Sequence, residues 1–321
     1  MNDMMKELYS IGLIPVIKIE NPDDAVPLAK ALIDGGLPAA EITFRTKCAA
    51  EAIKNITEAY PEMLVGAGTV LTTEQVDAAI AAGSKFLVSP GLNPKVTAYA
   101  LSKGIPMLPG CSNPSDIEAA LELGLTTVKF FPAEAAGGLK MLKAMAAPYG
   151  QLTFMPTGGI SQDNLLDYLK FNKIVACGGS FMVKDELVKE KKWEEITLLT
   201  KNAVKAMLGF EFLHMGINNE SEEEALRGAK LFECMFGMEV KVGGKSAFAG
   251  GAFEFMKSKG PGKHGHIAIR TNFVDRAMAY FKRMGFEFDE STITYDEKTG
   301  KPKFVYFKEE ICGFAIHLLQ K

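Results

Sequence analysis

A lysine interrupts an apolar run near the middle of the chain. Lys129 lies in TTVKFFP, residues 126–132, with Val128 before it and Phe130 after it. Lysine is rarely buried without compensation, because taking an ammonium group out of water is costly. Either the side chain reaches water from a strand end, or the protein uses the amine as a nucleophile. In the second case, desolvation by the neighbouring apolar side chains favours the neutral amine that can attack a carbonyl.

A second apolar run also carries polar side chains on one face. In AAEITFRT, residues 39–46, the strand period of two places Glu41, Thr43 and Arg45 on the same side. A strand that is simply packed in a core does not need them. The structural alternative is a buried ion pair between Glu41 and Lys129, although burying such a pair is seldom favourable.

Two pairs of glycines complete the pattern. Gly158-Gly159 and Gly178-Gly179 each stand at the end of an apolar run. Bare backbone lets amide N–H groups approach phosphate oxygens, so such turns suit a phosphate site, although glycine pairs are also common in ordinary turns. Beside an inward Glu, an inward Lys and an Arg at a strand end, the glycine turns favour an active site.

These residues belong to apolar runs that alternate with helix-like stretches over the first two thirds of the chain. Eight strands alternating with helices predict a parallel (β/α)8 barrel, an α/β fold in which chemistry gathers at the C-terminal strand ends. An open doubly wound sheet is the alternative from rhythm alone. The runs are residues 13–19, 39–44, 64–70, 85–90, 105–110, 126–132, 152–159 and 173–180.

Length and composition indicate a soluble protein with more than one domain. A chain of 321 residues exceeds most single domains. The net charge is −3 and the basic residues are scattered, which argues against nucleic-acid or membrane-surface partners. No apolar stretch approaches the length of a membrane span, and the first residues lack the apolar core of a signal peptide. The 5 cysteines form no CxxC pair, which predicts a reducing cytoplasm.

Six short motifs occur in order along the predicted barrel: EITFRT, GAGTVL, SPGL, KFFPAE, PTGGIS and GGS. With them, residues 1–208 resemble the 2-keto-3-deoxy-6-phosphogluconate (KDPG) / 2-keto-4-hydroxyglutarate (KHG) aldolases. These are class I, Schiff-base lyases on a TIM barrel. The resemblance implies cleavage of KDPG to pyruvate and glyceraldehyde 3-phosphate in Entner-Doudoroff carbohydrate metabolism, and cleavage of KHG to pyruvate and glyoxylate. It also implies a homotrimer, a phosphorylated keto-acid substrate and no cofactor.

The resemblance assigns a role to each matching residue. Lys129 is expected to form the Schiff base, and Glu41 is expected to be the general acid/base. Arg45 and Thr69 match the positions that hold the pyruvate carboxylate, and Thr157 matches a residue that contacts the substrate and influences stereochemistry. The remaining matches are Gly158, Gly159, Gly179 and Ser180 at the phosphate end and Pro90 and Phe131 in the pocket wall.

Two other functions remain open from the residues themselves. A phosphosugar isomerase or synthase would use the same phosphate-binding barrel, but it would not need Lys129 inside a strand. A metabolite-binding regulator would bind the substrate without turning it over. Trapping of a pyruvate adduct on Lys129 would distinguish the aldolase from both.

The last third of the chain reads as a separate domain with an internal repeat. All 4 histidines lie beyond residue 210. Residues 210–321 resemble the glyoxalase/bleomycin-resistance (vicinal oxygen chelate, VOC) superfamily, a smaller α+β fold of paired βαβββ modules. The resemblance places metal positions at His214, Glu254, His266 and His317, the last of which usually carries Glu. Such donors suit Zn, Ni, Mn or Fe(II). The alternative is a metal-free module that shapes an interface.

Overall fold

The computed structural model describes residues 3–321, which divide into two compact units between Met207 and Leu208. The sequence predicts this boundary at residues 208–210. No helix within the described range is both long and apolar enough to cross a bilayer.

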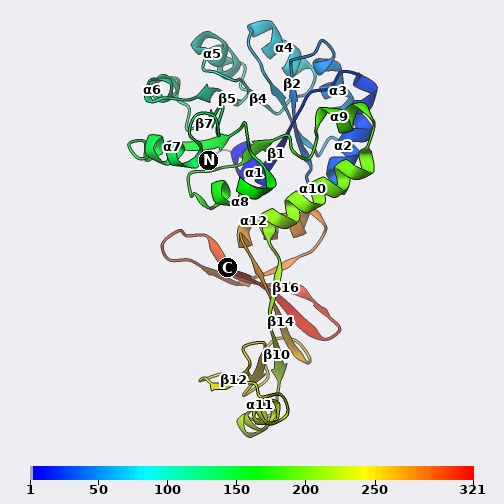
Figure 1. The fold of residues 1–321 in the computed structure, drawn as a ribbon, viewed down its shortest axis with the longest axis vertical. Helices are drawn as coiled ribbons and strands as arrows, with labels where there is room; N and C mark the ends of the chain where they lie inside the picture. Colours follow the sequence, from blue (N-terminus) through cyan, green and yellow to red (C-terminus); the bar gives the residue numbers. More distant parts are fainter. Residues whose placement is uncertain (1–2) are drawn as a thin grey trace. The chain divides into compact units, whose positions relative to one another are not determined.

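Parallel strands form the barrel predicted for the first unit (Figure 1). Hydrogen bonds join them in the orders β5-β4-β3-β2-β1-β9 and β6-β7-β8. Two isolated β-bridges join the β6-β7-β8 group to β9 and the residues before it. One links Phe154 to Ile174, and the other links Thr157 to Gly178. The bounds are β1 (Leu13–Ile17), β2 (Ala39–Thr43), β3 (Leu64–Gly68), β4 (Phe86–Val88), β5 (Met107–Leu108), β6 (Gly110–Cys111), β7 (Thr127–Phe130), β8 (Thr153–Pro156) and β9 (Cys177–Gly179).

One barrel position differs from its prediction. The fifth apolar run forms two short strands, β5 and β6, with Pro109 between them. Proline has no N–H to donate to a neighbouring strand, so the ladder is interrupted there. The next residue, Gly110, has no room for a side chain, because a Cβ at this position would lie 2.0 Å from the carbonyl oxygen of Pro90. Counting β5 and β6 as one interrupted strand gives the eight predicted barrel positions.

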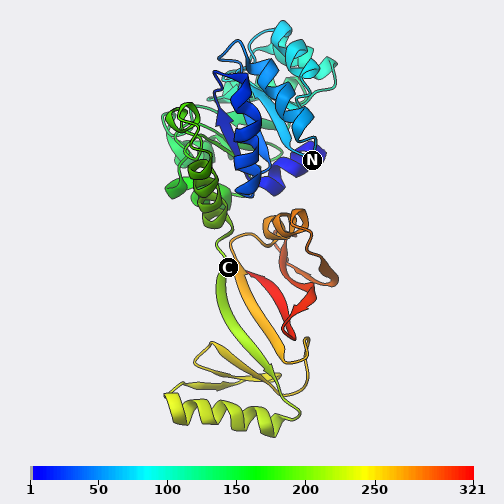
Figure 2. The same ribbon diagram turned by 90° about the vertical axis from the view of Figure 1, so that its right-hand side faces the viewer.

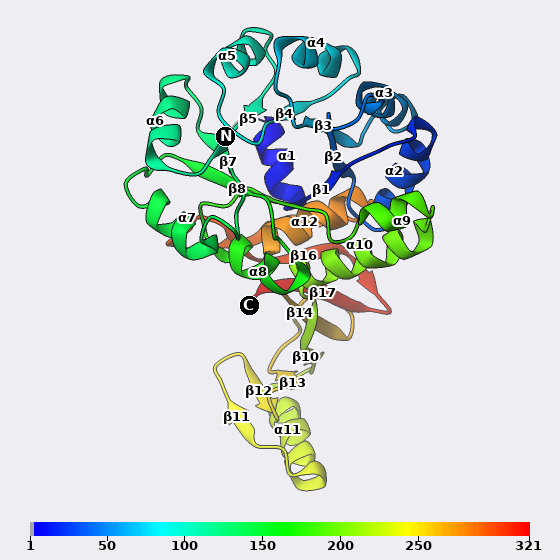
Figure 3. The ribbon, with the colours of Figure 1, turned by 45° about the horizontal axis from the view of Figure 1, so that its top comes forward.

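Helices surround the ring of strands (Figure 3). Several begin at a residue whose side chain accepts a backbone N–H, namely Thr72, Asn93 and Asn113. The helices are α1 (Asp3–Ile11), α2 (Ala25–Asp34), α3 (Ala49–Ala59), α4 (Thr73–Ala81), α5 (Pro94–Ser102), α6 (Pro114–Glu122), α7 (Gly138–Ala146), α8 (Gln162–Lys170), α9 (Asp185–Lys189) and α10 (Trp193–Leu208).

Helix α1 leads directly into β1 and therefore lies at the N-terminal end of the strands. Its residues Leu8 and Ile11 are fully or almost fully buried, and Figure 3 shows the helix inside the ring of strands in projection. This arrangement leaves the C-terminal strand ends for a functional site, as the barrel fold requires.

The second unit is one eight-stranded sheet built from two βαβββ modules (Figure 2). The strand order is β11-β12-β13-β10-β14-β17-β16-β15, and the modules meet where β10 pairs antiparallel with β14. The first module contains β10 (Glu211–Asn218), α11 (Glu222–Phe236), β11 (Val240–Val242), β12 (Ser246–Ala249) and β13 (Phe253–Met256). The second contains β14 (Gly265–Thr271), α12 (Val274–Arg283), β15 (Phe288–Tyr295), β16 (Pro302–Ile311) and β17 (Phe314–Gln320).

The start of α11 differs from what its sequence spacing predicts. Ser221 and Glu224 have the spacing of a reciprocal capping box at the start of α11. The Ser221 hydroxyl does accept the Glu224 N–H, but the Glu224 carboxylate accepts the N–H of Glu220 instead of that of Ser221. The helix start is therefore capped by two residues without the reciprocal bond.

Candidate active site and candidate metal centre

The barrel brings Lys129 and Glu41 together in its interior. Lys129 projects from β7 and Glu41 from β2, and the Lys129 Nζ lies 3.4 Å from the Glu41 Oε1. Both residues are almost completely buried, at 5% and 1% exposure. Removing one partner of such a pair leaves an uncompensated charge away from water, so each side chain fixes the other in place.

Strand β3 makes room for the Glu41 carboxylate. In the parallel pairing of β2 with β3, Glu41 is paired in register with Gly66, and Thr43 is paired with Gly68. A Cβ at Gly68 would lie 2.3 Å from Glu41 Oε1, so a side chain there would displace the carboxylate. The other carboxylate oxygen, Glu41 Oε2, is buried without a hydrogen-bond partner in the described structure. Buried polar atoms are normally satisfied, so this oxygen is available to a substrate group or to water.

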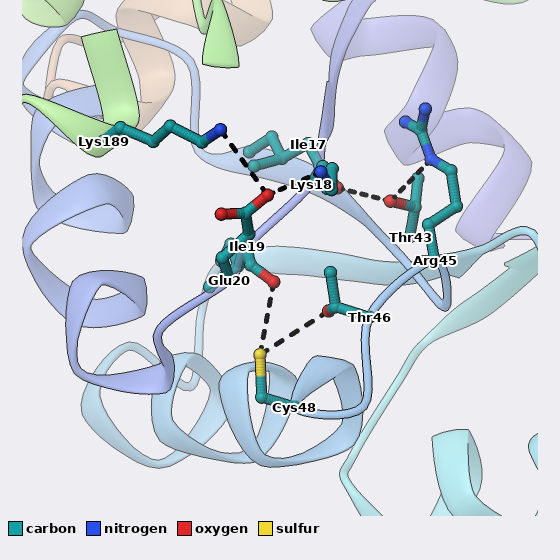
Figure 4. Close-up of polar contacts among 9 residues, drawn as sticks. All are labelled: Ile17, Lys18, Ile19, Glu20, Thr43, Arg45, Thr46, Cys48 and Lys189. Atoms are coloured by element: carbon teal, nitrogen blue, oxygen red, sulfur yellow. Dashed lines mark hydrogen bonds and ion pairs between the residues drawn. The ribbon is translucent and has the colours of Figure 1, made fainter. Parts of the chain in front are cut away.

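Arg45 lies just beyond the end of β2, where Figure 4 shows its guanidinium next to Thr43. Its Nε donates to the Thr43 hydroxyl over 3.1 Å, and that hydroxyl donates to the Ile17 carbonyl over 2.9 Å. This chain of bonds orients one edge of an otherwise exposed guanidinium. Its free N–H groups are thereby available for a carboxylate, which arginine binds well.

Three further predicted residues follow the C-terminal ends of their strands. Thr69 follows β3 with φ of 56°. A positive φ is uncommon for threonine and is typical of functional loops. Phe131 follows β7, and its ring centroid lies 5.2 Å from the Lys129 Nζ. Pro90 lies after β4 and is exposed, with its carbonyl against Gly110.

The glycine turns lie after β8 and at β9. Thr157 is buried at 6% exposure, and its hydroxyl has no hydrogen-bond partner among the described residues. It bridges to Gly178, where a Cβ would come within 2.4 Å of that hydroxyl. Gly158 and Gly159 have φ of 97° and 80°, in the region that favours glycine. Gly179 ends β9, and the exposed Ser180 follows it.

Lys18 and Cys111 also lie near strand ends, and the sequence motifs assign neither a role. Lys18 follows β1, and its Nζ lies 2.6 Å from Glu20 Oε1, which Lys189 also approaches (Figure 4). The strand period could have indicated Lys18, because it lies two residues beyond Val16, and Val16 is paired in register with Glu41. Cys111 ends β6, and burial raises the pKa of its thiol to about 12, so it is not a thiolate nucleophile.

This arrangement supports amine chemistry on a carbonyl compound. A buried lysine stands beside a carboxylate with one free oxygen, and a guanidinium lies at the neighbouring strand end. A family model described as "Aldolase: KDPG and KHG aldolase" matches residues 3–199, which is more than half of the chain.

The chain belongs to the KDPG and KHG aldolase family.

Individual relatives align over nearly their whole length. The 2-dehydro-3-deoxy-phosphogluconate aldolase of Haemophilus influenzae is 48% identical over 201 residues, which are 63% of this chain and 95% of the relative. The KHG/KDPG aldolase of Escherichia coli K12 is 42% identical over 193 residues, which are 60% of this chain and 91% of the relative.

Solved structures of KDPG aldolases are similar to the same share of the chain. The Legionella pneumophila enzyme, with pyruvate captured as a covalent carbinolamine, has a TM-score of 0.60 at 38% identity and covers 62% of this chain and 97% of its own. The Zymomonas mobilis enzyme with 3-phosphoglycerate has a TM-score of 0.58 at 42% identity and covers 62% and 94%. The family match ends at residue 199, so the second unit is an addition to a KDPG/KHG aldolase barrel.

The second unit of this family member gathers its predicted metal residues on neighbouring strands. His214, His266 and His317 each offer a ligand atom, and these atoms lie within 4.8 Å of one another. The Nε2 atoms of His214 and His266 are 3.0 Å apart. Glu254 Oε2 lies 3.2 Å from the first and 3.1 Å from the second. All four predicted side chains therefore come from four strands to one place.

The geometry and chemistry of this cluster fit a divalent metal. Nitrogen and oxygen ligands about 2.0–2.2 Å from one ion lie about 3 Å from each other, as three of these donor atoms do. Burial would raise the pKa of Glu254, but hydrogen bonds from His214, His266 and Ser246 hold it well below its usual range. Burial, together with His266 and His214, lowers the pKa of His317 to about 3, so its imidazole is neutral, as a metal ligand must be.

Proposed function

We propose that the barrel is a class I aldolase that cleaves KDPG to pyruvate and glyceraldehyde 3-phosphate, and KHG to pyruvate and glyoxylate. The observation that carries this proposal is the buried contact between Lys129 and Glu41 inside a barrel of this family. The Legionella relative, which holds pyruvate as a covalent carbinolamine, supports a covalent route through an amine. A phosphosugar isomerase would not require the lysine.

The first half of the reaction forms an imine on Lys129. The ammonium gives a proton to Glu41, whose Oε1 lies 3.4 Å away, and the neutral amine attacks the C2 carbonyl of the substrate. The carbinolamine then takes a proton from Glu41 at its hydroxyl and loses water. The product is an iminium that joins Lys129 to C2 and acts as an electron sink.

The second half breaks the bond between C3 and C4. Glu41, ionised again, accepts the proton of the C4 hydroxyl, through water or directly, as the bond electrons move toward the iminium nitrogen. The aldehyde leaves, and an enamine of pyruvate remains on Lys129. Protonation at C3 and hydrolysis of the imine then release pyruvate and restore the amine.

The other predicted residues orient the two ends of the substrate. We propose that Arg45 and Thr69 bind the carboxylate of the pyruvate half and that Thr157, through its free hydroxyl, contacts the substrate at the bond that breaks. Pro90 and Phe131 would form the pocket wall. The phosphate would lie against the backbone of Gly158, Gly159, Gly179 and Ser180, and the Zymomonas relative holds a phosphorylated acid, 3-phosphoglycerate.

We also propose a cellular setting from the family resemblance. The protein would be a cytoplasmic homotrimer that serves the Entner-Doudoroff route of carbohydrate metabolism. The imine is the electron sink, so the aldolase step would need no cofactor. Equilibrium sedimentation of the purified protein would test the trimer directly.

Ser180→Asp should impair the phosphorylated substrate more than KHG. Ser180 is exposed at the C-terminal end of β9, where a new carboxylate would face the phosphate, and like charges at short range repel strongly. We expect kcat/KM for KDPG to fall at least about tenfold more than kcat/KM for KHG. Ser180→Asn, of the same shape without the charge, is the matched control. Equal losses on both substrates would remove the phosphate from this turn.

We further propose that residues 210–321 form a VOC-like domain that holds a divalent metal at His214, Glu254, His266 and His317. The support is the convergence of these donors from four strands of two βαβββ modules. The ion would be Zn, Ni, Mn or Fe(II), with nitrogen donors favouring the later metals of this group. Bound there, it would supply Lewis acidity.

The two units should act independently in the aldolase reaction. Lys129 and Glu41 both belong to the first unit, and imine chemistry uses the lysine as its electron sink. We expect EDTA to remove metal from the full-length protein, as measured by metal analysis, and to leave the aldolase rate unchanged. A protein that ends at Leu208 should retain most of the activity, provided that it is soluble. Activity that EDTA abolishes and added metal restores would instead place the second unit in the aldolase site.

A further inference from the structure

The four donors of the proposed metal centre occupy two pairs of equivalent positions. His214 and His266 lie on the first strands of the two modules, β10 and β14. Glu254 lies level with Gly216 of β10, and His317 lies level with Ala268 of β14. Gly216 and Ala268 are each two residues beyond the histidine of their strand. Each module thus supplies a histidine at its first donor position. At the second position, the first module has a carboxylate, Glu254, and the second module has an imidazole, His317.

This difference sets the charge of a loaded centre. A divalent ion held by two carboxylates and two neutral imidazoles would be formally neutral. With one carboxylate and three neutral imidazoles, the same ion keeps one positive charge. A net charge in a largely buried site is costly unless a counter-charge binds, so the site would favour an anion.

A single carboxylate, that of Glu254, forms ion pairs within the cluster. Among residues 3–321, the ion pairs of these four side chains are those of Glu254 with His214 and His266. The other Glu254 oxygen accepts the Ser246 hydroxyl over 2.6 Å. Aromatic rings surround the donors. The ring centroid of Phe248 lies 5.5 Å from that of His214. Those of Phe304 and Tyr306 lie 4.7 and 5.0 Å from that of His317.

The two donors of the first module are more accessible to solvent than those of the second. The side chains of His214 and Glu254 are 13% and 14% exposed, whereas His266 and His317 are more deeply buried. A small ligand can therefore approach the donors of the first module. Its apolar part would contact aromatic rings, and its charged part would meet the ion.

We propose that the second domain binds a small monocarboxylate with an oxygen on the adjacent carbon, that is, a 2-oxo acid. This inference rests on the metal centre proposed above. The carboxylate neutralises the remaining positive charge, and the two oxygens can bind one ion together. Pyruvate and glyoxylate, the 2-oxo acids that the proposed aldolase reaction releases, both belong to this class, so the second domain would act on or sense a product of the first.

The test uses the full-length protein, freed of metal and reloaded with Co²⁺, whose visible absorption reports on its ligands. Metal analysis after dialysis measures Co²⁺ binding, which should fall in His266→Ala. Pyruvate should change the absorption in a saturable way, whereas methyl pyruvate, which lacks the charge, should not. The barrel amine does not contribute, because the absorption belongs to the ion.

Two variants at one position separate charge from shape. His317→Glu makes the loaded centre neutral and should weaken pyruvate binding at least about tenfold, whereas His317→Gln keeps the charge and should retain it. Co²⁺ binding without a pyruvate response, or equal responses in the two variants, would overturn this inference and leave the metal centre standing. Failure to bind Co²⁺ would overturn both, while the aldolase proposal is tested separately by its own activity.

Discussion

Lys129→Gln is expected to abolish aldolase turnover, with a loss of at least about 10⁴-fold in kcat. Glutamine retains a polar side chain but has no amine, so the imine cannot form. Lys129→Arg should be equally inactive, because a guanidinium stays charged and does not form the imine. In the natural protein, borohydride with pyruvate should leave a reduced pyruvyl group on Lys129, identified by peptide mass spectrometry.

The loss must be separated from unfolding. Glu41 would remain buried without its counter-charge, and removing one partner of a buried pair typically costs about 3–5 kcal/mol. The melting temperature of Lys129→Gln should therefore fall, and the double variant with Glu41→Gln should recover part of it while staying inactive. Lys140→Gln, an exposed lysine on α7, is the control for the substitution itself. A pyruvyl group found on another lysine would disprove the assignment.

Glu41→Gln should slow turnover by about 10² to 10⁴-fold, the usual contribution of a positioned acid/base. The amide fits the same space against Gly68 but cannot carry the proton between Lys129 and the substrate. The rate should fall for KDPG and KHG alike, because the proton transfers are common to both. Single-turnover measurements should show slower imine formation as well as slower cleavage.

The matched control for Glu41 is Glu51→Gln, an exposed carboxylate on α3. It should leave kcat and the melting temperature nearly unchanged. If Glu41→Gln folds and its rate stays within threefold of the natural protein, Glu41 has no part in proton transfer. If its rate falls but borohydride still traps pyruvate at the natural rate, Glu41 acts in cleavage and not in imine formation.

Strand period predicted which side chains point inward, but it did not predict their distances. Glu41 and Lys129 are 88 positions apart, and their contact depends on barrel closure and register, which are tertiary properties. The space at Gly68 is likewise invisible in sequence, because the atom that a side chain would strike belongs to β2. The roles assigned to these residues came from the family resemblance and are tested by the variants above.

Some strand boundaries differ from the predicted apolar runs. The run at residues 105–110 was predicted as one strand, but Pro109, which has no N–H to donate, divides it into β5 and β6. In the second domain, β12 is almost entirely buried and the C-terminal part of β16 is exposed, so neither strand shows the alternation of a half-buried strand along its whole length. The donor cluster was predicted as a set, but its distances depend on the pairing of β10 with β14 and of each with its parallel neighbour.

The pairing of β10 with β14 has an evolutionary consequence. Each module supplies a first-strand histidine and one further donor, and the two strands run antiparallel through the middle of the sheet. Two separate copies of one module, related by a two-fold axis, would adopt this arrangement and would build the centre from two identical pairs of donors. In such a dimer any substitution appears twice. In a chain that carries both modules, Glu254 and His317 can differ, so the charge of the centre can change by one unit, which an exactly symmetrical dimer does not allow.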